Sequence, residues 1–142
     1  MSWFPKQKVV VPIDFSDESF TAIATALEMV DDPCNVEVVH VLQELSPMEP
    51  GELWKTLDKA TRVRHTTKAL RERLESGGHI AVSTDVVIGD AGREISDLAE
   101  REKADLIVLT SHGRTGLKRL LIGSVAERVT RLAHCPILVL RS

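Results

Sequence analysis

Short apolar runs rich in β-branched residues alternate along the chain with segments whose apolar residues recur at helical spacing. The runs predict strands buried on both faces, and the segments predict helices that cover them. The expected strands are residues 8–14, 36–42, 79–87, 105–110 and 136–140. The expected helices are residues 16–30, 52–76, 93–103 and 125–133. This alternation predicts a single doubly wound, Rossmann-like α/β domain over residues 1–142, with helices on both faces of a five-stranded parallel sheet in the order 3-2-1-4-5.

Composition and charge narrow the class of protein. The net charge of −3 argues against a general nucleic-acid binder, and 4% aromatic residues without tyrosine argue against a base-stacking surface. No apolar run approaches the length of a membrane span, and the first residues lack a signal-peptide pattern. Cys34 and Cys135 fit neither a CxxC motif nor a metal cluster, and we expect both to be buried or half-buried. A cytoplasmic protein without nucleic-acid or membrane partners is expected.

The strongest candidate for a binding site follows the fourth expected strand. There the chain reads Thr110-Ser-His-Gly113-Arg-Thr-Gly116, and Gly123-Ser124-Val125 opens the next helix. The first N–H groups of a helix have no internal partner and lie at the positive end of its dipole, so a glycine-bearing basic loop before a helix is typical of phosphate sites. This segment predicts nucleotide binding, with Arg114 suited to a bidentate phosphate contact.

Each of these features also has an interpretation without a ligand. Ser124-Val-Ala-Glu127 matches a capping box, in which both side chains satisfy the helix's own N–H groups. Both interpretations hold if a phosphate replaces the Ser124 cap on binding. The basic residues between the glycines form either a phosphate-binding or a merely solvated loop, and His112 either neighbours the phosphate or is an ordinary loop residue.

The first expected strand ends at Asp14, where the chain has neither GxGxxG nor a P-loop sequence. In the order 3-2-1-4-5 the strand order reverses between the first and fourth strands, which places Asp14 across a crevice from the Gly113 loop. Its carboxylate can accept hydrogen bonds from hydroxyl or amino groups of a ligand. Alternatively, Asp14 caps the helix that follows.

These residues resemble the universal stress protein family over essentially the whole chain. The resemblance is carried by Asp14 after an apolar strand, by Gly113-x9-Gly123-Ser124-Val125, and by the final Cys-Pro-Ile-Leu-Val-Leu run. It implies an adenine and ribose pocket lined by Pro12, Ile13, Asp14 and Val41, and phosphates held by Gly113, Arg114, Gly123, Ser124 and Val125. Thr110 stands where the pattern Gly-x2-Gly-x9-Gly-Ser/Thr of the nucleotide-binding branch has its first glycine, so its side chain either crowds the ribose or bonds to it.

The resulting hypothesis is a stress or signalling protein that binds ATP, or AMP or ADP, with Mg²⁺ or Mn²⁺ held mainly by the phosphates. No Walker-type lysine or paired magnesium carboxylates are present, so any ATPase or autophosphorylation activity is expected to be slow. The alternatives are a ligand-free dimeric interaction module and a small adenylyl-transfer enzyme. The last strand, Ile137–Leu140, carries no charge to protect a sheet edge, which predicts a homodimer through this strand, as the resemblance also does.

Overall fold

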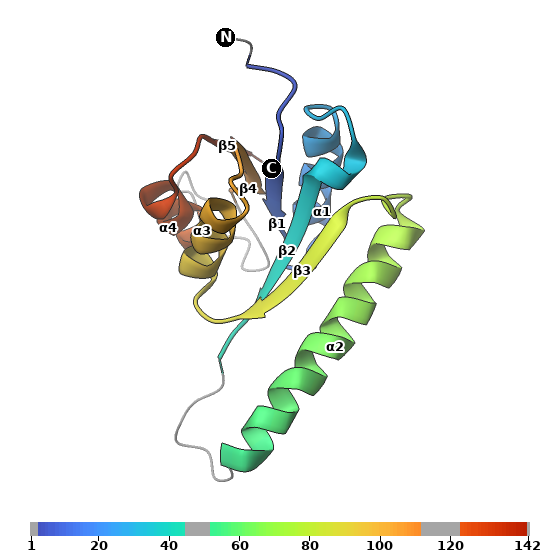
Figure 1. The fold of residues 1–142 in the computed structure, drawn as a ribbon, viewed down its shortest axis with the longest axis vertical. Coiled ribbons are helices and arrows are strands. Elements are labelled where there is room, and N and C mark those ends of the chain that lie inside the picture. The colour runs from blue at the N-terminus through green and yellow to red at the C-terminus, as the bar shows by residue number, and fades with distance from the viewer. Residues whose placement is uncertain (1–2, 45–51, 112–122, 142) are drawn as a thin grey trace.

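The computed structural model describes residues 3–44, 52–111 and 123–141, and the side chains of residues 52–57 lie outside that description. The described chain forms one sheet of five parallel strands in the order β3-β2-β1-β4-β5, surrounded by helices (Figure 1). The predicted fold class and strand order are therefore confirmed. The strands are β1 (Val9–Pro12), β2 (Val36–Leu42), β3 (Ser83–Ile88), β4 (Leu106–Thr110) and β5 (Ile137–Leu140). The helices are α1 (Asp17–Leu27), α2 (Glu52–Ser76), α3 (Ala91–Arg101) and α4 (Ser124–Leu132), with a 3₁₀ turn η1 (Pro33–Asn35) before β2.

Several element boundaries differ from the sequence-based expectation by a few residues, and the starts of α3 and β3 differ for identifiable reasons. α3 begins at Ala91 rather than residue 93, because the Asp90 carboxylate caps it by accepting a hydrogen bond from the Arg93 N–H at 3.1 Å. β3 begins at Ser83 rather than residue 79. Gly78, with φ +79°, turns the chain after α2, and residues 79–82 lie in turns before the strand begins. The expectation for the cysteines is correct for Cys135 but wrong for Cys34, which is exposed in η1.

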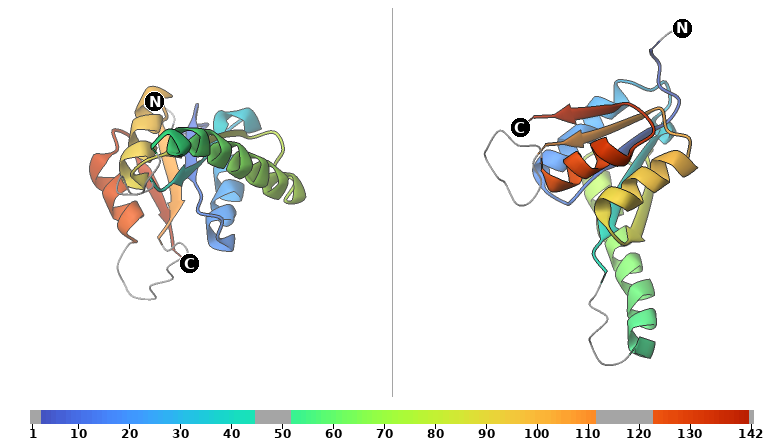
Figure 2. Two further views of the ribbon diagram at one scale, coloured as in Figure 1. Left: turned by 90° about the horizontal axis from the view of Figure 1, so that it is seen from below. Right: turned by 90° about the vertical axis from the view of Figure 1, so that its left-hand side faces the viewer.

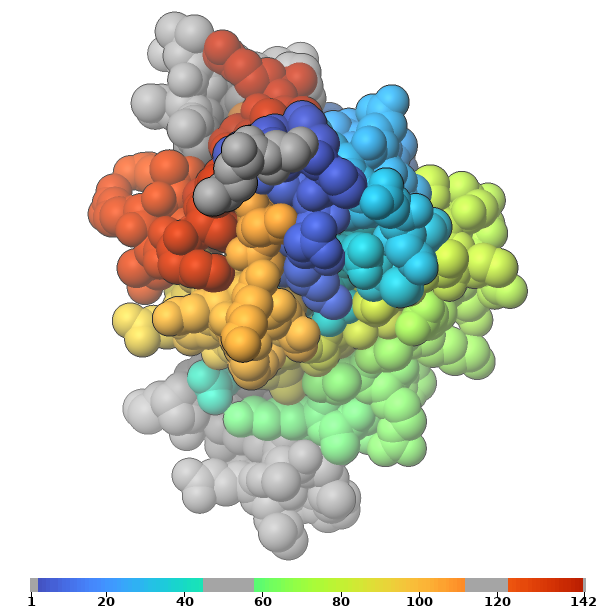
Figure 3. Space-filling model, turned by 45° about the horizontal axis from the view of Figure 1, so that its top comes forward, coloured from blue at the N-terminus to red at the C-terminus, as the bar shows by residue number. Residues whose placement is uncertain are grey.

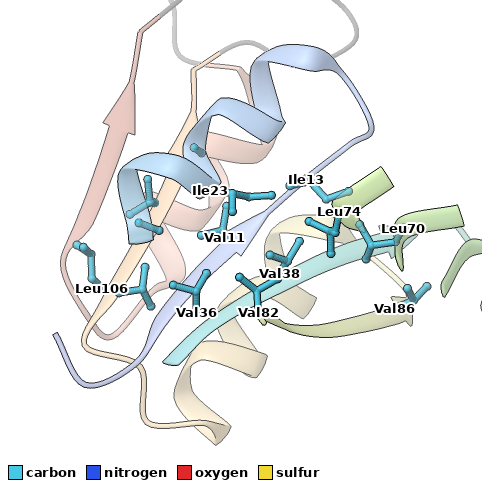
Figure 4. Close-up of a cluster of buried hydrophobic side chains, with 14 residues drawn as sticks. Val11, Ile13, Ile23, Val36, Val38, Leu70, Leu74, Val82, Val86 and Leu106 are labelled. Carbon is cyan, nitrogen blue, oxygen red and sulfur yellow. The ribbon is translucent and has the colours of Figure 1, made fainter. Parts of the chain in front are cut away.

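Alternate residues of β1 belong to two separate apolar clusters, one on each face of the sheet. Val9 and Val11 pack with α1 and α2, whereas Val10 packs with α3 and α4. Figure 4 shows Val11 in the first of these clusters, and Figure 2 shows the two pairs of helices on the two faces of the sheet. All three valines are fully buried, as expected for a parallel strand covered on both sides. β1 is thus the central strand against which both helical layers are placed. No helix among the described residues has the length and apolarity needed to cross a membrane.

The segment before β1 lies at the amino ends of the strands, the opposite edge from the expected site. It runs between the end of α1 and the start of β4 (Figure 3), where the Lys6 N–H donates to the Met29 carbonyl at 2.7 Å. The backbone N–H groups of Gln7 and Lys8 both donate to the Asp105 carboxylate, at 2.9 and 3.0 Å. These bonds attach β1 to β4 before their ladder begins, on the side away from any ligand.

A buried carboxylate also lies toward the amino end of the sheet. Glu37 in β2 is only 7% exposed, and its Oε2 atom is buried without a hydrogen-bond partner among the described residues. Burial raises the pKa of this carboxyl group, an effect that Asp85 and Glu102 reinforce and that Lys8 and Arg71 oppose. Ionisation of Glu37 therefore destabilises the folded state.

We expect Glu37→Gln to increase the free energy of unfolding at pH 7 by about 1 kcal/mol, the scale of one unsatisfied buried group. Because the folded pKa is raised, the gain is present above the pKa of an exposed glutamate and disappears below it, where the carboxyl is protonated in both states. Urea denaturation at pH 4 and pH 7 measures this, with the exposed Glu100→Gln as control. An equal gain for Glu37→Gln at both pH values would contradict the assignment.

Candidate ligand pocket at the carboxyl ends of the strands

A pocket of about 260 Å³ opens at the carboxyl ends of β1 and β4. This is where the strand order reverses, the expected ligand position in an open parallel sheet. Eight of the residues expected at the site line it, namely Pro12, Ile13, Asp14, Val41, Thr110, Gly123, Ser124 and Val125. The structure thus brings together residues that are far apart in the chain. His112, Gly113 and Arg114, also expected at the site, lie outside the described residues.

The pocket has further lining residues that sequence reasoning did not identify. They are Ser19, Val39, His40, Ala91, Ile95, Leu109, Ser111 and Ala126. Ala91 and Ile95 come from the first turns of α3, which follows β3. These two residues could have been predicted, because the carboxyl ends of parallel strands, β3 included, lie at the same edge of the sheet. His40, in contrast, is on a strand interior, where a sequence carries no signal of ligand proximity.

The β1–α1 turn presents Asp14 to the pocket. Its Oδ1 atom accepts hydrogen bonds from the Ser16 N–H at 3.0 Å and the Ser16 hydroxyl at 2.5 Å, and its own N–H donates to Ser19 Oγ at 3.2 Å. The N-cap of α1 is Ser16, whose Oγ accepts from the Ser19 N–H. The alternative in which Asp14 itself caps α1 is therefore wrong, because Ser16 already occupies that role.

Phe15, which follows Asp14, has an unfavourable backbone conformation. Its φ of 67° lies in the left-handed region, which costs a residue with a side chain roughly 1–2 kcal/mol. Its ring lies 4.8 Å from the His40 ring and 6.0 Å from the Phe20 ring, centroid to centroid, both in edge arrangements. These contacts hold the turn in the shape that places Asp14 at the mouth of the pocket.

On the opposite wall, Gly123 connects the end of β4 with the start of α4. Its N–H donates to the Ser111 carbonyl at 2.6 Å, and a Cβ at this position would lie only 2.7 Å from the same oxygen. The close approach therefore requires glycine. It turns the chain so that α4 begins at Ser124, directly against the pocket.

The expected capping box at the start of α4 is absent. Gly123 is the N-cap and makes no side-chain cap bond, so Ser124 is the first helical residue rather than the cap. The Glu127 carboxylate instead bonds Arg131 at 2.7 Å, one turn further along the helix. The first intrahelical bond joins the Glu127 N–H to the Gly123 carbonyl, so the N–H groups of Ser124, Val125 and Ala126 precede the helical ladder. All three residues line the pocket.

The packing of α4 against α3 aims this helix start at the pocket. Gly92 in α3 lets the two helices approach closely, since a Cβ there would lie 2.6 Å from the Arg128 side chain. The Arg128 Nε donates to the Asp90 carboxylate at 2.8 Å, so the cap of α3 also binds α4.

The two polar walls of the pocket are chemically complementary. The β1 side offers a carboxylate at Asp14, and the β4 side offers the positive end of the α4 dipole. Between them, Val39, Val41, Ile95 and Leu109 supply an apolar surface. Within the described part of the chain no group of three or more His, Cys, Asp or Glu side chains could hold a metal ion. Such a pocket suits an elongated ligand with a flat apolar part and an anionic end.

Comparison with known proteins agrees with this architecture. The sequence profile of the Universal stress protein family matches residues 6–141. Universal stress protein MJ0531 of Methanocaldococcus jannaschii is 36% identical over 141 residues, which cover 95% of this chain and 82% of that protein.

Solved structures share the fold over nearly the whole chain. That of MJ0577, also from M. jannaschii, has a TM-score of 0.75 at 26% identity and covers 96% of both chains. A universal stress protein in complex with cAMP has a TM-score of 0.62 at 20% identity, with 95% of this chain and 97% of that chain covered. An Arabidopsis thaliana member with AMP bound has a TM-score of 0.56 at 17% identity, with 95% and 91% covered.

The contact between Gly123 and Ser111 makes a direct prediction. Gly123→Ala places a methyl group against a backbone carbonyl that cannot move without disturbing β4, so we expect a loss of about 1–3 kcal/mol in the free energy of unfolding. Gly77→Ala is the matched control, since its Cβ meets nothing closer than 3.4 Å and should change stability by no more than about 0.5 kcal/mol. Urea denaturation measures both, and equal stabilities for the two variants would contradict the close approach.

Proposed function

Because the chain belongs to the universal stress protein family, we propose that its pocket binds an adenine nucleotide, with ATP as the expected ligand and AMP or ADP as alternatives. The observation that carries the proposal is a single pocket that joins the Asp14 carboxylate to the first turn of α4. In the bound state the phosphates lie at the N–H groups of Ser124, Val125 and Ala126, and the base lies between the apolar side chains.

The two family members with bound cAMP and AMP support an adenine nucleotide as the ligand class. Family resemblance adds Gly113 and Arg114 to the phosphate end, where His112 is either a neighbour of the phosphates or an ordinary loop residue. A Mg²⁺ or Mn²⁺ ion would be held mainly by the phosphates, with Asp14 as the carboxylate among the described lining residues. The cation supplies charge neutralisation of the phosphates.

The proposed role is a stress or signalling module of the cytoplasm that binds its nucleotide and hydrolyses it slowly or not at all. Among the described lining residues only Asp14 and His40 are ionisable, and neither is placed as part of a Walker-type site. Linear ATP turnover on the order of tens per minute or faster would favour an enzyme instead. A ligand-free interaction module is the alternative, in which the Thr110 side chain leaves too little room for the ribose.

We also propose that the protein is a homodimer through β5, an edge strand of the sheet. The carbonyls of Pro136 and Leu140 accept hydrogen bonds from Ile107 in β4 and from Ser111 directly after it, so by strand alternation the backbone groups of Ile137 and Val139 point away from β4. A row of strand donors and acceptors that β4 does not use, without charged residues, is suited to pairing with a second copy.

Nucleotide binding is tested by placing a negatively charged side chain at the proposed phosphate end of the pocket. ATP with Mg²⁺ should raise the melting temperature of the unmodified protein by several degrees, the scale of about 2.7 kcal/mol at a hundredfold excess over Kd. Ser124→Glu should reduce ATP affinity at least roughly tenfold, or about 1.4 kcal/mol, because its carboxylate repels the phosphates.

The same Ser124→Glu variant should keep its stability without ATP, because an acidic residue in the first turn interacts favourably with the helix dipole. Ser124→Gln is the neutral control of similar size. Thermal shift and isothermal titration calorimetry provide the measurements. An absent shift for the unmodified protein, or identical affinities for all three proteins, would count against phosphate binding at α4.

The edge-strand dimer is tested by removing one outward N–H group. Val139→Pro deletes a donor that β4 does not use, and proline is tolerated on edge strands, so the fold should persist while the dimer dissociates. Val139→Ala, which keeps the N–H, is the control and should remain dimeric. Light scattering after size-exclusion chromatography reports the mass, and a monomeric unmodified protein or a dimeric Val139→Pro would reject this interface.

A further inference from the structure

His40 makes a hydrogen bond that determines where β1 leaves the sheet. Its Nδ1 atom lies 2.8 Å from the Ile13 carbonyl oxygen, and because a carbonyl only accepts, Nδ1 carries the hydrogen and donates it. The Ile13 N–H donates to the Val39 carbonyl, also at 2.8 Å. Both backbone polar groups of Ile13 are therefore bonded to β2, one through the main chain and one through the imidazole.

The same imidazole also contacts the residue on the other side of Asp14. The Phe15 ring packs edge-on against it at 4.8 Å, and Phe15 has the left-handed φ of 67°. A residue in such a conformation persists only where its surroundings hold it there. One side chain thus contacts both neighbours of Asp14, the residue before it by a hydrogen bond and the residue after it by ring packing.

His40 is a polar residue on a face of β2 that is otherwise apolar. Strand alternation places His40 on the same face as Val36 and Val38, which are fully buried in the cluster under α1 and α2. A valine or leucine would be the ordinary residue on that face. The imidazole is accounted for by its bond to Ile13 and by its location at the pocket, which it lines.

We propose that His40 is a positioning residue that holds the β1–α1 turn so that the Asp14 carboxylate faces the nucleotide. This inference rests on the proposed nucleotide binding and assigns the residue that organises the Asp14 side of the site. His40 acts through Asp14, and its removal lets Ile13 and Phe15 relax and turns the carboxylate away.

A double-mutant cycle on ATP affinity tests the assignment. His40→Gln lacks a donor at the Nδ1 position, whereas His40→Asn keeps an amide N–H close to that position. We expect His40→Gln and Asp14→Asn each to weaken ATP binding roughly tenfold, and the double variant to be no weaker than either single one. His40→Asn should recover most of the affinity that His40→Gln loses. Calorimetry on the full chain gives the dissociation constants.

Three results would overturn the proposal. Losses that multiply in the double variant would mean that His40 acts independently of Asp14. If His40→Gln weakens ATP binding but Asp14→Asn does not, the Asp14 carboxylate makes no contact with the nucleotide that His40 could position. Equal affinities for His40→Gln and His40→Asn would exclude the Nδ1 hydrogen bond as the cause.

Hydrogen exchange without nucleotide separates this inference from the proposed function. The Ser16 N–H is bonded to Asp14 Oδ1 at 3.0 Å and reports the turn directly. In the ligand-free protein this amide should exchange at least roughly fivefold faster in His40→Gln than in His40→Asn, with core amides unchanged. If the unmodified protein binds no ATP but this difference is present, the proposed function fails while the positioning role stands. Identical Ser16 exchange in the two variants would overturn the positioning role.

Discussion

The hydrogen bond between the Gly123 N–H and the Ser111 carbonyl is the constraint on which the site depends. At 2.6 Å, with no room for a Cβ, it joins the carboxyl end of β4 to the first residue before α4. A residue with a side chain would displace the helix start from the pocket. The two apolar clusters then fix the remaining geometry, because α4 packs beside α3 on one face while α1 follows β1 on the other. Asp14 and Ser124 face one pocket because these two connections leave the sheet at the same edge.

Polar groups interrupt this apolar sheet at both ends, with different consequences. At the carboxyl ends, Ser111 is buried but has both backbone groups bonded, and His40 donates to Ile13. At the amino end, Glu37 is buried with one oxygen that bonds to none of the described residues. The Ser111 backbone and the His40 Nδ1 atom are thus bonded within the protein, which holds the ends of β1 and β4 in one arrangement before any ligand arrives.

Much of the fold and part of the site could be predicted from the sequence, for physical reasons. Apolar strands buried on both faces and amphipathic helices in alternation leave few other topologies, and the order 3-2-1-4-5 placed Asp14 opposite Gly123-Ser124. The start of α4 was mispredicted because the capping-box pattern does not report that Gly123 must approach Ser111. His40 was missed because its role depends on a carbonyl 27 residues away and on the rare conformation of Phe15. Such contacts between distant residues have no local sequence pattern.

Ser111 has a further consequence through its two backbone bonds. Its carbonyl accepts from Gly123 at the pocket, and its N–H donates to the Leu140 carbonyl, the last residue of β5, at 2.8 Å. Ser111 therefore links Gly123 at the pocket directly to Leu140 at the end of the edge strand. A displacement of the first turn of α4 would reach β5 through two hydrogen bonds, without passing through the core. The ligand pocket and the edge strand are in this sense structurally coupled.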